Sequence, residues 1–495
     1  MRKGRLFRIA VMAGSMVLGF SPRILAEGAL STKVLEEQVE ALTRKVQLLE
    51  KRLEQQAQQS APAKALEPPP SGAVEALDQK VRVLERRYEI DQETAAAKAK
   101  DAPIVGAGKD GFSLRSADGN FQLRVRGYVQ ADGRFLVDDR KRLGTDTFIM
   151  RRVRPIIEGT VYKYFDYRIM PDFGQGNARL FDGYLNARLW PEAQLRVGKY
   201  KPPVGLERLQ SATDLLFVER GLPTNLVPNR DVGTQLWGDL FDGAASYALG
   251  VFNGVPDLGN GDLDNNDAKD FNGRLFAHPF KNTSLAPLQG LGIGLSGTYG
   301  RQTGVVSNPN LPAYLTQDQL TFFRYRSDGT TAGTVIAEGE HSRWSPQGYY
   351  YWGPFGLLSE YVWSTQGVKR NKVHATLDNR AWQVQLSYVL TGEDSSYRGV
   401  SPAHPFDPMT GQWGAFQLAA RYGELHVDDD AFPIFADPTK SARRDHSWGI
   451  GLNWYLNRNL RFMLNYEESD FTGGDGKNGD RPTEQAILTR FQISY

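Results

Sequence analysis

The chain has 495 residues, of which 40% are hydrophobic, and its 59 Lys and Arg nearly balance its 57 Asp and Glu, which gives a formal net charge of +2. It contains no cysteine, which excludes disulfide scaffolds, thiolate metal sites and cysteine nucleophiles. A mean hydropathy of −0.45, without an apolar run of membrane-spanning length past the N-terminus, excludes a membrane protein built of several helices.

The first 26 residues predict a secretory signal peptide. Four basic residues lie within the first eight positions, an apolar stretch follows over 9–20, and the segment closes on Ile24-Leu-Ala. The apolar stretch is too short for a membrane anchor. We therefore expect residues 1–26 to direct export, with a buried N-terminal helix as the alternative.

Two stretches after the leader, 30–58 and 73–92, carry apolar residues alternately four and three positions apart. Such heptads predict coiled-coil segments. One helix cannot bury so narrow a stripe, so we expect a periplasmic coiled coil that pairs protomers. Two short helices with a solvated charged face are the alternative. Linkers are predicted at 59–72, which contains three consecutive prolines, and at 93–111.

From residue 112 to 495 the apolar period is 2, which predicts β-strands. Short connections mostly alternate with long ones, as in bacterial outer-membrane barrels, which have short periplasmic turns and longer extracellular loops. Two connections, 281–290 and 392–412, are longer than this pattern allows, so either they are insertions or a strand is miscounted. The sixteen candidate strands lie at 121–136, 148–161, 163–173, 180–190, 193–201, 231–240, 243–253, 271–280, 291–301, 340–352, 355–366, 376–391, 413–425, 446–456, 459–470 and 484–495.

The end of the chain favours a membrane barrel over a soluble β-domain. Phe491, Ile493 and Tyr495 share one face of the last strand, and closing a barrel requires this strand to pair with the first. Aromatic residues such as Trp190 and Trp413 lie near strand ends, where interfacial girdles are expected. The predicted fold is all-β: a 16-stranded antiparallel transmembrane β-barrel after a short α-helical coiled coil.

Four stretches resemble the phosphate-selective porin O and P family: FIMRRVRPIIEGT at 148–160, YFDYRIMPDFG at 164–174, LRVGKYKPPVGLERL at 195–209 and YALGVFNG at 247–254. The resemblance covers residue 112 to the end. It implies a trimeric porin of the outer membrane whose third loop, about 202–230, folds inward and narrows the pore. It also implies that Phe491, Ile493 and Tyr495 form the aromatic signal read by the barrel-assembly machinery.

The charge of the first strands predicts what such a pore passes. Strand parity places arginines on the polar face, and this face must be the lumen because Lys or Arg facing lipid at mid-depth costs roughly 2–4 kcal/mol. Arginine offers a rigid fork of N–H donors that matches two phosphate oxygens, and a row of moderate sites favours conduction. The predicted anion path consists of Arg124, Arg126, Arg134, Arg152, Arg154, Arg168, Arg188 and Arg196.

Acidic residues leave an alternative open. Asp132, Glu158, Asp166, Asp172 and Asp182 lie on the same strand faces, so the wall can also be a mixed network with weak selectivity. The predicted constriction loop is likewise balanced, because it has four acidic residues: Glu207, Asp214, Glu219 and Asp231. Its basic residues are Lys199, Lys201, Arg208, Arg220 and Arg230.

Two stretches match enzyme or metal-binding motifs in part, but each lacks the surrounding residues or elements that the function requires. A GxGxxG match at 292–297 lies within a strand, without the helix that dinucleotide binding requires. The acidic run at 262–267 lacks the glycine and the closing glutamate of a calcium loop. We expect no catalytic residue, cofactor, metal or nucleic-acid partner.

These features together predict an outer-membrane diffusion porin for small anions, with phosphate or pyrophosphate as the first solute to test. A homotrimer is expected, in contact with outer-membrane lipid and lipopolysaccharide. A porin for other solutes and a structural envelope tether with a closed barrel are the alternatives. Single-channel conductance separates these possibilities.

Overall fold

The structure is a computed structural model that describes residues 51, 71–108, 111–137, 144–264, 266–476 and 479–495. The chain divides into two compact units, Met1–Ala95 and Ala96–Tyr495. The predicted signal peptide lies outside the described residues, as do the first coiled-coil segment apart from Lys51 and the linker up to residue 70. In the described part of the chain, no helix combines the length and the apolar character needed to cross a membrane.

Helix α3 (Ser71–Asp101) contains the second predicted coiled-coil segment. Val81, Leu84 and Tyr88 are exposed along it, and their pairing with another helix stays a prediction. The helix continues through the alanine-rich stretch 95–100, because alanine has the highest helix propensity. The prediction of a linker from residue 93 is therefore wrong over this stretch.

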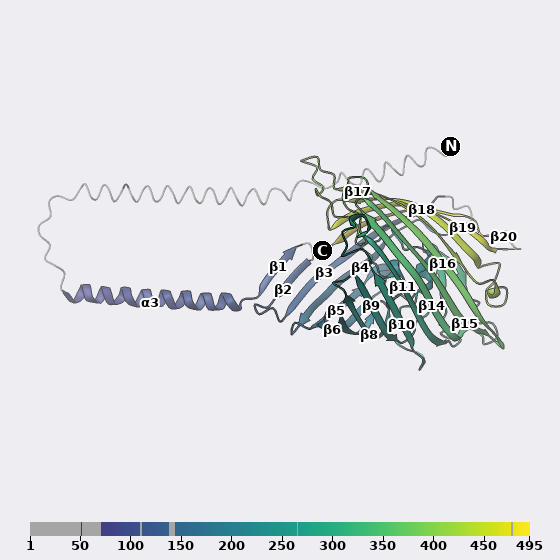
Figure 1. The fold of residues 1–495 in the computed structure, drawn as a ribbon, viewed down its shortest axis with the longest axis horizontal. Helices are drawn as coiled ribbons and strands as arrows, with labels where there is room; N and C mark the ends of the chain where they lie inside the picture. Colours follow the sequence, from purple (N-terminus) through teal and green to yellow (C-terminus); the bar gives the residue numbers. More distant parts are fainter. Residues whose placement is uncertain (1–50, 52–70, 109–110, 138–143, 265, 477–478) are drawn as a thin grey trace. The chain divides into compact units, whose positions relative to one another are not determined.

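The second unit is a closed antiparallel barrel of sixteen strands (Figure 1), in which β21 pairs with β3 from Ala486 opposite Leu136 to Ser494 opposite Tyr128. All sixteen predicted strands are present. They are β3 (Gln122–Leu136), β4 (Thr147–Val161), β5 (Phe165–Asp172), β6 (Arg179–Trp190), β7 (Ala193–Tyr200), β8 (Asp231–Leu240), β9 (Ala245–Phe252), β10 (Asp270–Ala277), β11 (Leu291–Thr303), β14 (Val335–Trp352), β15 (Phe355–Arg370), β16 (Val373–Val389), β17 (Ala415–His426), β18 (Ala442–Tyr455), β19 (Leu460–Asp475) and β21 (Glu484–Ser494).

The two irregular connections are insertions, since the strand count holds on both sides of them. They run between β10 and β11 and between β16 and β17, on the same side of the barrel as the short turns and the C-terminus. Periplasmic turns of outer-membrane barrels are short, so this side is the periplasmic end. On the opposite end β15 and β16 extend beyond their predicted limits to a tight turn at 371–372.

A hairpin that the sequence did not predict precedes the barrel. Strands β1 (Ile104–Gly108) and β2 (Gly111–Arg115) pair with each other, and β2 pairs with the start of β3 over Gln122–Val125. The linker prediction fails here too, because a five-residue strand with two glycines shows little period-2 alternation. The hairpin occupies the part of the β3 edge that β21 leaves unpaired.

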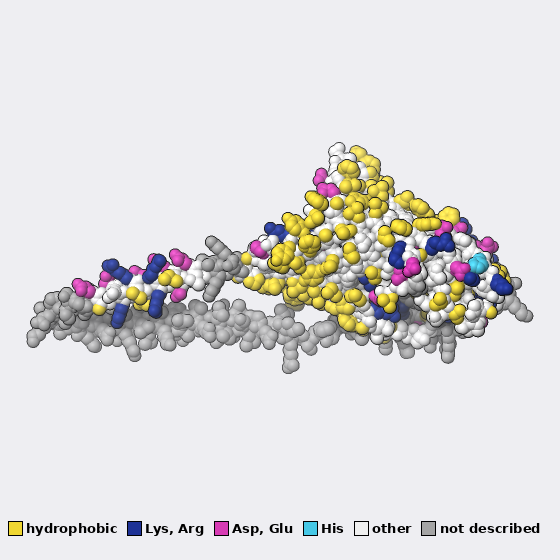
Figure 2. Space-filling model, turned by 90° about the horizontal axis from the view of Figure 1, so that it is seen from below, with side chains coloured by type: hydrophobic (Ala, Val, Ile, Leu, Met, Phe, Trp, Pro, Cys, Tyr) yellow, Lys and Arg dark blue, Asp and Glu magenta, His cyan; other side chains and the backbone are white. Residues whose placement is uncertain are grey.

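The outside of the barrel is apolar. Figure 2 shows hydrophobic side chains spread over the visible face of the barrel, with charged side chains gathered toward one end. Trp190, Trp352 and Trp413 are more than half exposed at periplasmic strand ends, as expected for an interfacial girdle. Tyr349, near the same end of β14 as Trp352, instead stacks on Tyr397 with ring centroids 5.1 Å apart.

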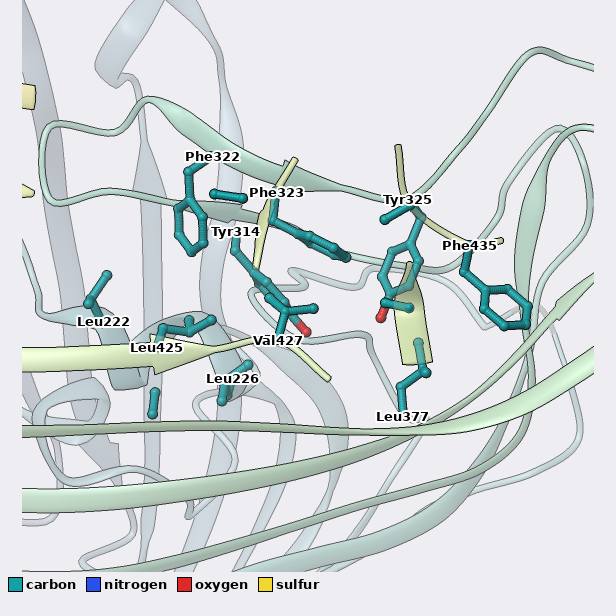
Figure 3. Close-up of a cluster of buried hydrophobic side chains, with 14 of the residues drawn as sticks. Leu222, Leu226, Tyr314, Phe322, Phe323, Tyr325, Leu377, Leu425, Val427 and Phe435 are labelled. Carbon is teal, nitrogen blue, oxygen red and sulfur yellow. The ribbon is translucent and has the colours of Figure 1, made fainter. Parts of the chain in front are cut away.

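The largest apolar core lies inside the barrel. Loop 304–334 carries a two-stranded sheet, β12 (Ala313–Leu315) and β13 (Thr321–Arg324), whose aromatic side chains lie against the inner faces of β15, β16 and β17 (Figure 3). The sequence placed this loop between two strands but did not predict that it folds into the lumen. The core includes Tyr314, Phe322, Phe323, Tyr325, Val362, Leu377 and Leu425.

Candidate functional site

Loop 201–230 also folds into the lumen, where it forms a short helix α4 (Leu206–Leu209) and a 3-10 turn η2 (Leu222–Leu226). Its backbone is fastened to the far wall. The amide of Leu206 donates to Glu360 at 2.6 Å, and the amide of Val218 donates to Asn465 at 2.7 Å. The inward course of the loop, implied by the family resemblance, is thus present.

A periplasmic segment meets this loop from the other end. In turn 390–414, the hydroxyl of Tyr397 donates to the carbonyl of Leu206 at 2.6 Å, and Gln210 donates to the carbonyl of Tyr397 at 2.7 Å. Loop 304–334 joins the same packing, since Asn225 and Leu315 exchange two hydrogen bonds of 2.9 Å. These three segments fill the lumen on the side of β14–β18.

Two cavities remain open on the opposite side, against β3–β7. The inner cavity, of about 750 Å³, reaches the periplasmic end of the barrel at Ser494 and Tyr495. The outer cavity, of about 340 Å³, reaches residues of the outer loops such as Gln175, Leu258 and Gln319. Six residues line both cavities and form the junction between them: Arg151, Arg152, Phe181, Arg208, Arg220 and Asn229.

Positive charge dominates the inner cavity. Ten arginines and Lys201 line it, against two acidic residues, Asp182 and Asp214. Six of the arginines are ion-paired. Arg151 and Arg152 pair with Glu219, Arg154 with Asp172 at 2.8 Å, and Arg230 with Asp182 at 3.0 Å. Further pairs join Arg126 and Arg168 to Glu158 at 2.7 and 3.2 Å.

Five other cations of the inner cavity form no ion pair with a described carboxylate. Neutral groups hold the three that belong to the loop. Lys201 donates to the carbonyls of Leu209 and Gln210, Arg208 donates to the carbonyl of Thr224, and Arg220 donates to the carbonyls of Glu207 and Gln210. These three side chains are therefore fixed in place without a carboxylate partner among the described residues. The five residues are Arg196, Lys201, Arg208, Arg220 and Arg398.

Aromatic rings hold Arg196. Its guanidinium lies 4.6 Å from the ring centroid of Tyr184, 4.7 Å from that of Trp237 and 5.3 Å from that of Tyr200. Rings attract a cation without cancelling its formal charge. The buried Nε of Arg196 has no hydrogen-bond partner among the described residues.

The acidic residues of the loop face away from the inner cavity, apart from Asp214. Glu207 accepts hydrogen bonds from Gln383 and Gln385 on β16, both at 2.9 Å. Asp231 accepts from the amides of Val232 and Gly254, both at 2.8 Å. The charge balance counted along the sequence therefore does not hold for the surface of the cavity.

Glu219 fastens the loop to the barrel wall through four guanidinium groups. Burial alone would raise the pKa of its carboxyl, yet these arginines lower that pKa well below the ordinary value, so the group is ionised. It lines the outer cavity only. Its partners are Arg151 at 2.5 Å, Arg134 at 3.0 Å, Arg152 at 3.2 Å and Arg490 at 3.4 Å.

A β-bulge brings Arg151 into the junction. In the register of β3 and β4, Gln130 faces Arg152 and Ala131 faces Met150, so Arg151 is an extra residue. The bulge reverses the parity of β4, and the side chains of Arg151 and Arg152 both reach Glu219. Strand parity without the bulge would place Arg151 on the face opposite Arg152.

Three residues of the predicted anion path, Arg124, Arg134 and Arg188, line neither cavity. Arg124 and Arg188 are exposed, with Arg188 paired to Asp166 at 3.1 Å, and Arg134 is bound to Glu219. Lys199, predicted in the constriction, is buried in an ion pair with Asp262. Five predicted path residues do line the inner cavity: Arg126, Arg152, Arg154, Arg168 and Arg196.

Arg398 is a lining residue that sequence reasoning missed. It belongs to turn 390–414, whose unusual length for a periplasmic connection was its one visible signal. Phe491, Ile493 and Tyr495 are 49%, 41% and 39% exposed near the end of the chain, which leaves their predicted role in assembly open to a test.

Comparisons with known proteins found similar solved structures and one sequence family. The chain is similar in structure to a loop-deletion variant of OmpT from Vibrio cholerae (12% identity, 76% of this chain and 100% of that chain covered, TM-score 0.48). It is also similar to the outer membrane channel DcaP of Acinetobacter baumannii (10%, 76% and 98%, TM-score 0.47) and to an anion-selective porin from Comamonas acidovorans (9%, 76% and 100%, TM-score 0.45). No curated protein sequence matches the chain.

The barrel, the inward loop and the basic passage coincide with the region that a sequence family describes. The family model for phosphate-selective porin O and P matches residues 121–495, which cover the barrel from just before β3 to the last residue. The chain therefore belongs to the phosphate-selective porin O and P family of outer-membrane porins.

Proposed function

We propose that this porin passes small anions, phosphate or pyrophosphate foremost, through the two cavities along β3–β7. The supporting observation is the set of five cavity cations that form no ion pair with a described carboxylate. Backbone carbonyls hold Lys201, Arg208 and Arg220, and aromatic rings hold Arg196. An anion entering the junction meets charge that no protein group has neutralised. A cation meets the same charge as a barrier.

The guanidinium groups suit phosphate for geometric reasons. Each presents a planar fork of N–H donors that can bind two oxygens at once. The arginines follow one another from Arg179 at the outer cavity to Arg126 at the inner cavity. A series of moderate sites favours transfer from one to the next over tight retention.

We propose a homotrimer in the membrane. Strands β5, β7, β9 and β10 have eight residues each, whereas β14 has 18. A tilted strand takes about 9–11 residues to span the bilayer. The barrel wall at these strands is therefore shorter than the bilayer is thick, and it is suited to burial against other copies of the chain. The predicted periplasmic coiled coil, contacts with lipopolysaccharide and recognition by the barrel-assembly machinery belong to the same proposal.

Reversal potentials in planar bilayers test the proposal. In a KCl gradient, channels of the purified protein should show chloride to be more permeant than potassium, and added phosphate should reduce the chloride current. A reversal potential near zero favours the alternative of a general porin, which the ion pairs of Arg126, Arg154, Arg168 and Arg230 support. Absence of channels favours a structural tether with a closed barrel.

A further inference from the structure

The cavity junction contains one aromatic ring. Among its six shared lining residues, four are arginines and one is Phe181, on β6. The guanidinium of Arg154 lies 4.0 Å from the ring centroid of Phe181, and that of Arg230 lies 4.9 Å from it. An anionic group bound by the junction arginines therefore places the rest of its molecule beside this ring.

The wall next to Phe181 is apolar. Tyr128, Ile156, Met170 and Ala212 form a buried hydrophobic cluster against which Phe181 packs, and all five residues also line the inner cavity. Inorganic phosphate gains nothing from such a surface, whereas an organic group loses water on binding it. The apolar patch thus lies within reach of the positive charge of the junction.

The space is larger than an inorganic anion requires. The inner cavity, at about 750 Å³, has the size of pockets that bind drug-sized organic molecules, which is roughly 300–1,000 Å³. Planar rings stack on aromatic side chains and on guanidinium planes. The outer cavity offers less, since Phe181 is its single aromatic residue among those described.

We infer that the junction and the wall beside Phe181 form a binding site for organic anions in which a planar apolar ring is attached to the charged group, such as aryl phosphates. The inference rests on the proposed anion path and adds the class of solute. The arginines hold the charged group, and Phe181 with its apolar neighbours holds the ring. Solutes of this class pass more slowly than inorganic phosphate because each stays bound for longer.

Blockade of the chloride current tests this site with two probes of similar charge. Phenyl phosphate carries a planar ring, whereas glycerol phosphate does not. Stacking of one ring is expected to lower the half-blocking concentration of phenyl phosphate about tenfold relative to glycerol phosphate. Phe181→Leu keeps an apolar side chain but removes the ring, so the difference between the two probes should shrink to about twofold.

Phe276→Leu is the matched control. Phe276 also lies under an arginine, with Arg274 at 4.5 Å from its ring centroid, but it lines neither cavity. This variant should keep the full preference for phenyl phosphate. Equal blockade by the two probes in the unmodified channel, or an undiminished preference in Phe181→Leu, overturns the inference while the anion path stands. A cation-selective channel overturns both.

Discussion

Replacement of Glu219 by glutamine tests whether charge at the junction sets the selectivity of the pore. The glutamine amide retains an oxygen that can accept hydrogen bonds from the surrounding arginines, so loop 201–230 should keep its position. The four junction arginines and Glu219 together carry a formal charge of +3, which becomes +4 in the variant. We expect anion selectivity to rise.

The size of the change follows from the outer cavity, which Glu219 lines. A volume of 340 Å³ corresponds to a sphere of about 4 Å radius. Two unit charges about 4 Å apart in water interact with an energy of about 1 kcal/mol. Salt at about 0.1 M reduces this interaction energy to about 0.6 kcal/mol. Because the variant favours anions and disfavours cations by that amount, the ratio of chloride to potassium permeability should rise about sevenfold.

Glu207→Gln provides the control for this measurement. Glu207 belongs to the same loop and is equally buried, but its carboxylate is bound to Gln383 and Gln385 and lines neither cavity. Reversal potentials in a KCl gradient should therefore shift strongly for the Glu219 variant and little for the Glu207 variant. Equal shifts, or an unchanged ratio in the Glu219 variant, would refute the assignment of selectivity to the junction.

Two further predictions concern the wall and the second inward loop. Alanine at both Arg152 and Arg154 should lower anion selectivity in the same bilayer assay, whereas Arg188→Ala, outside the cavities, should leave it unchanged; unaltered selectivity in the double variant would move the path to loop 201–230. In loop 304–334, burial and the nearby Glu484 raise the pKa of Asp318 well above its ordinary value. The folded barrel thus retains a proton that the unfolded chain has lost, so the free energy of unfolding should fall as pH rises through the raised pKa. Asp318→Asn should remove this dependence on pH. Denaturant unfolding at a series of pH values measures it.

The strands of the barrel could be predicted because each alternates apolar and polar residues between lipid and lumen. The second strand was expected at 148–161 and is found at Thr147–Val161. Alternation does not reveal a bulge, since the extra residue is defined by the partner strand. For this reason the predicted anion path includes Arg152 but not its neighbour Arg151, although both side chains reach Glu219.

Where the connecting segments fold could not be predicted from local sequence patterns. Loop 304–334 folds inward because its aromatic residues find apolar partners on β15, β16 and β17, which lie far away in the sequence. The β1–β2 hairpin forms because the last strand leaves part of the β3 edge unpaired. Both outcomes depend on how strands meet when the barrel closes, and no single segment contains that information.

In the proposed path, ion selectivity depends as much on which part of the lumen the loops fill as on which residues carry charge. Loop 304–334, loop 201–230 and turn 390–414 occupy the side of β14–β18, so the two cavities that form the proposed path lie on the side of β3–β7. The same packing binds Glu207 to the far wall, while Glu219 is held by the arginines of the near wall. A near-neutral loop thereby presents a basic surface, because Glu207 and Glu219 fasten the loop while most of its cations line the cavities.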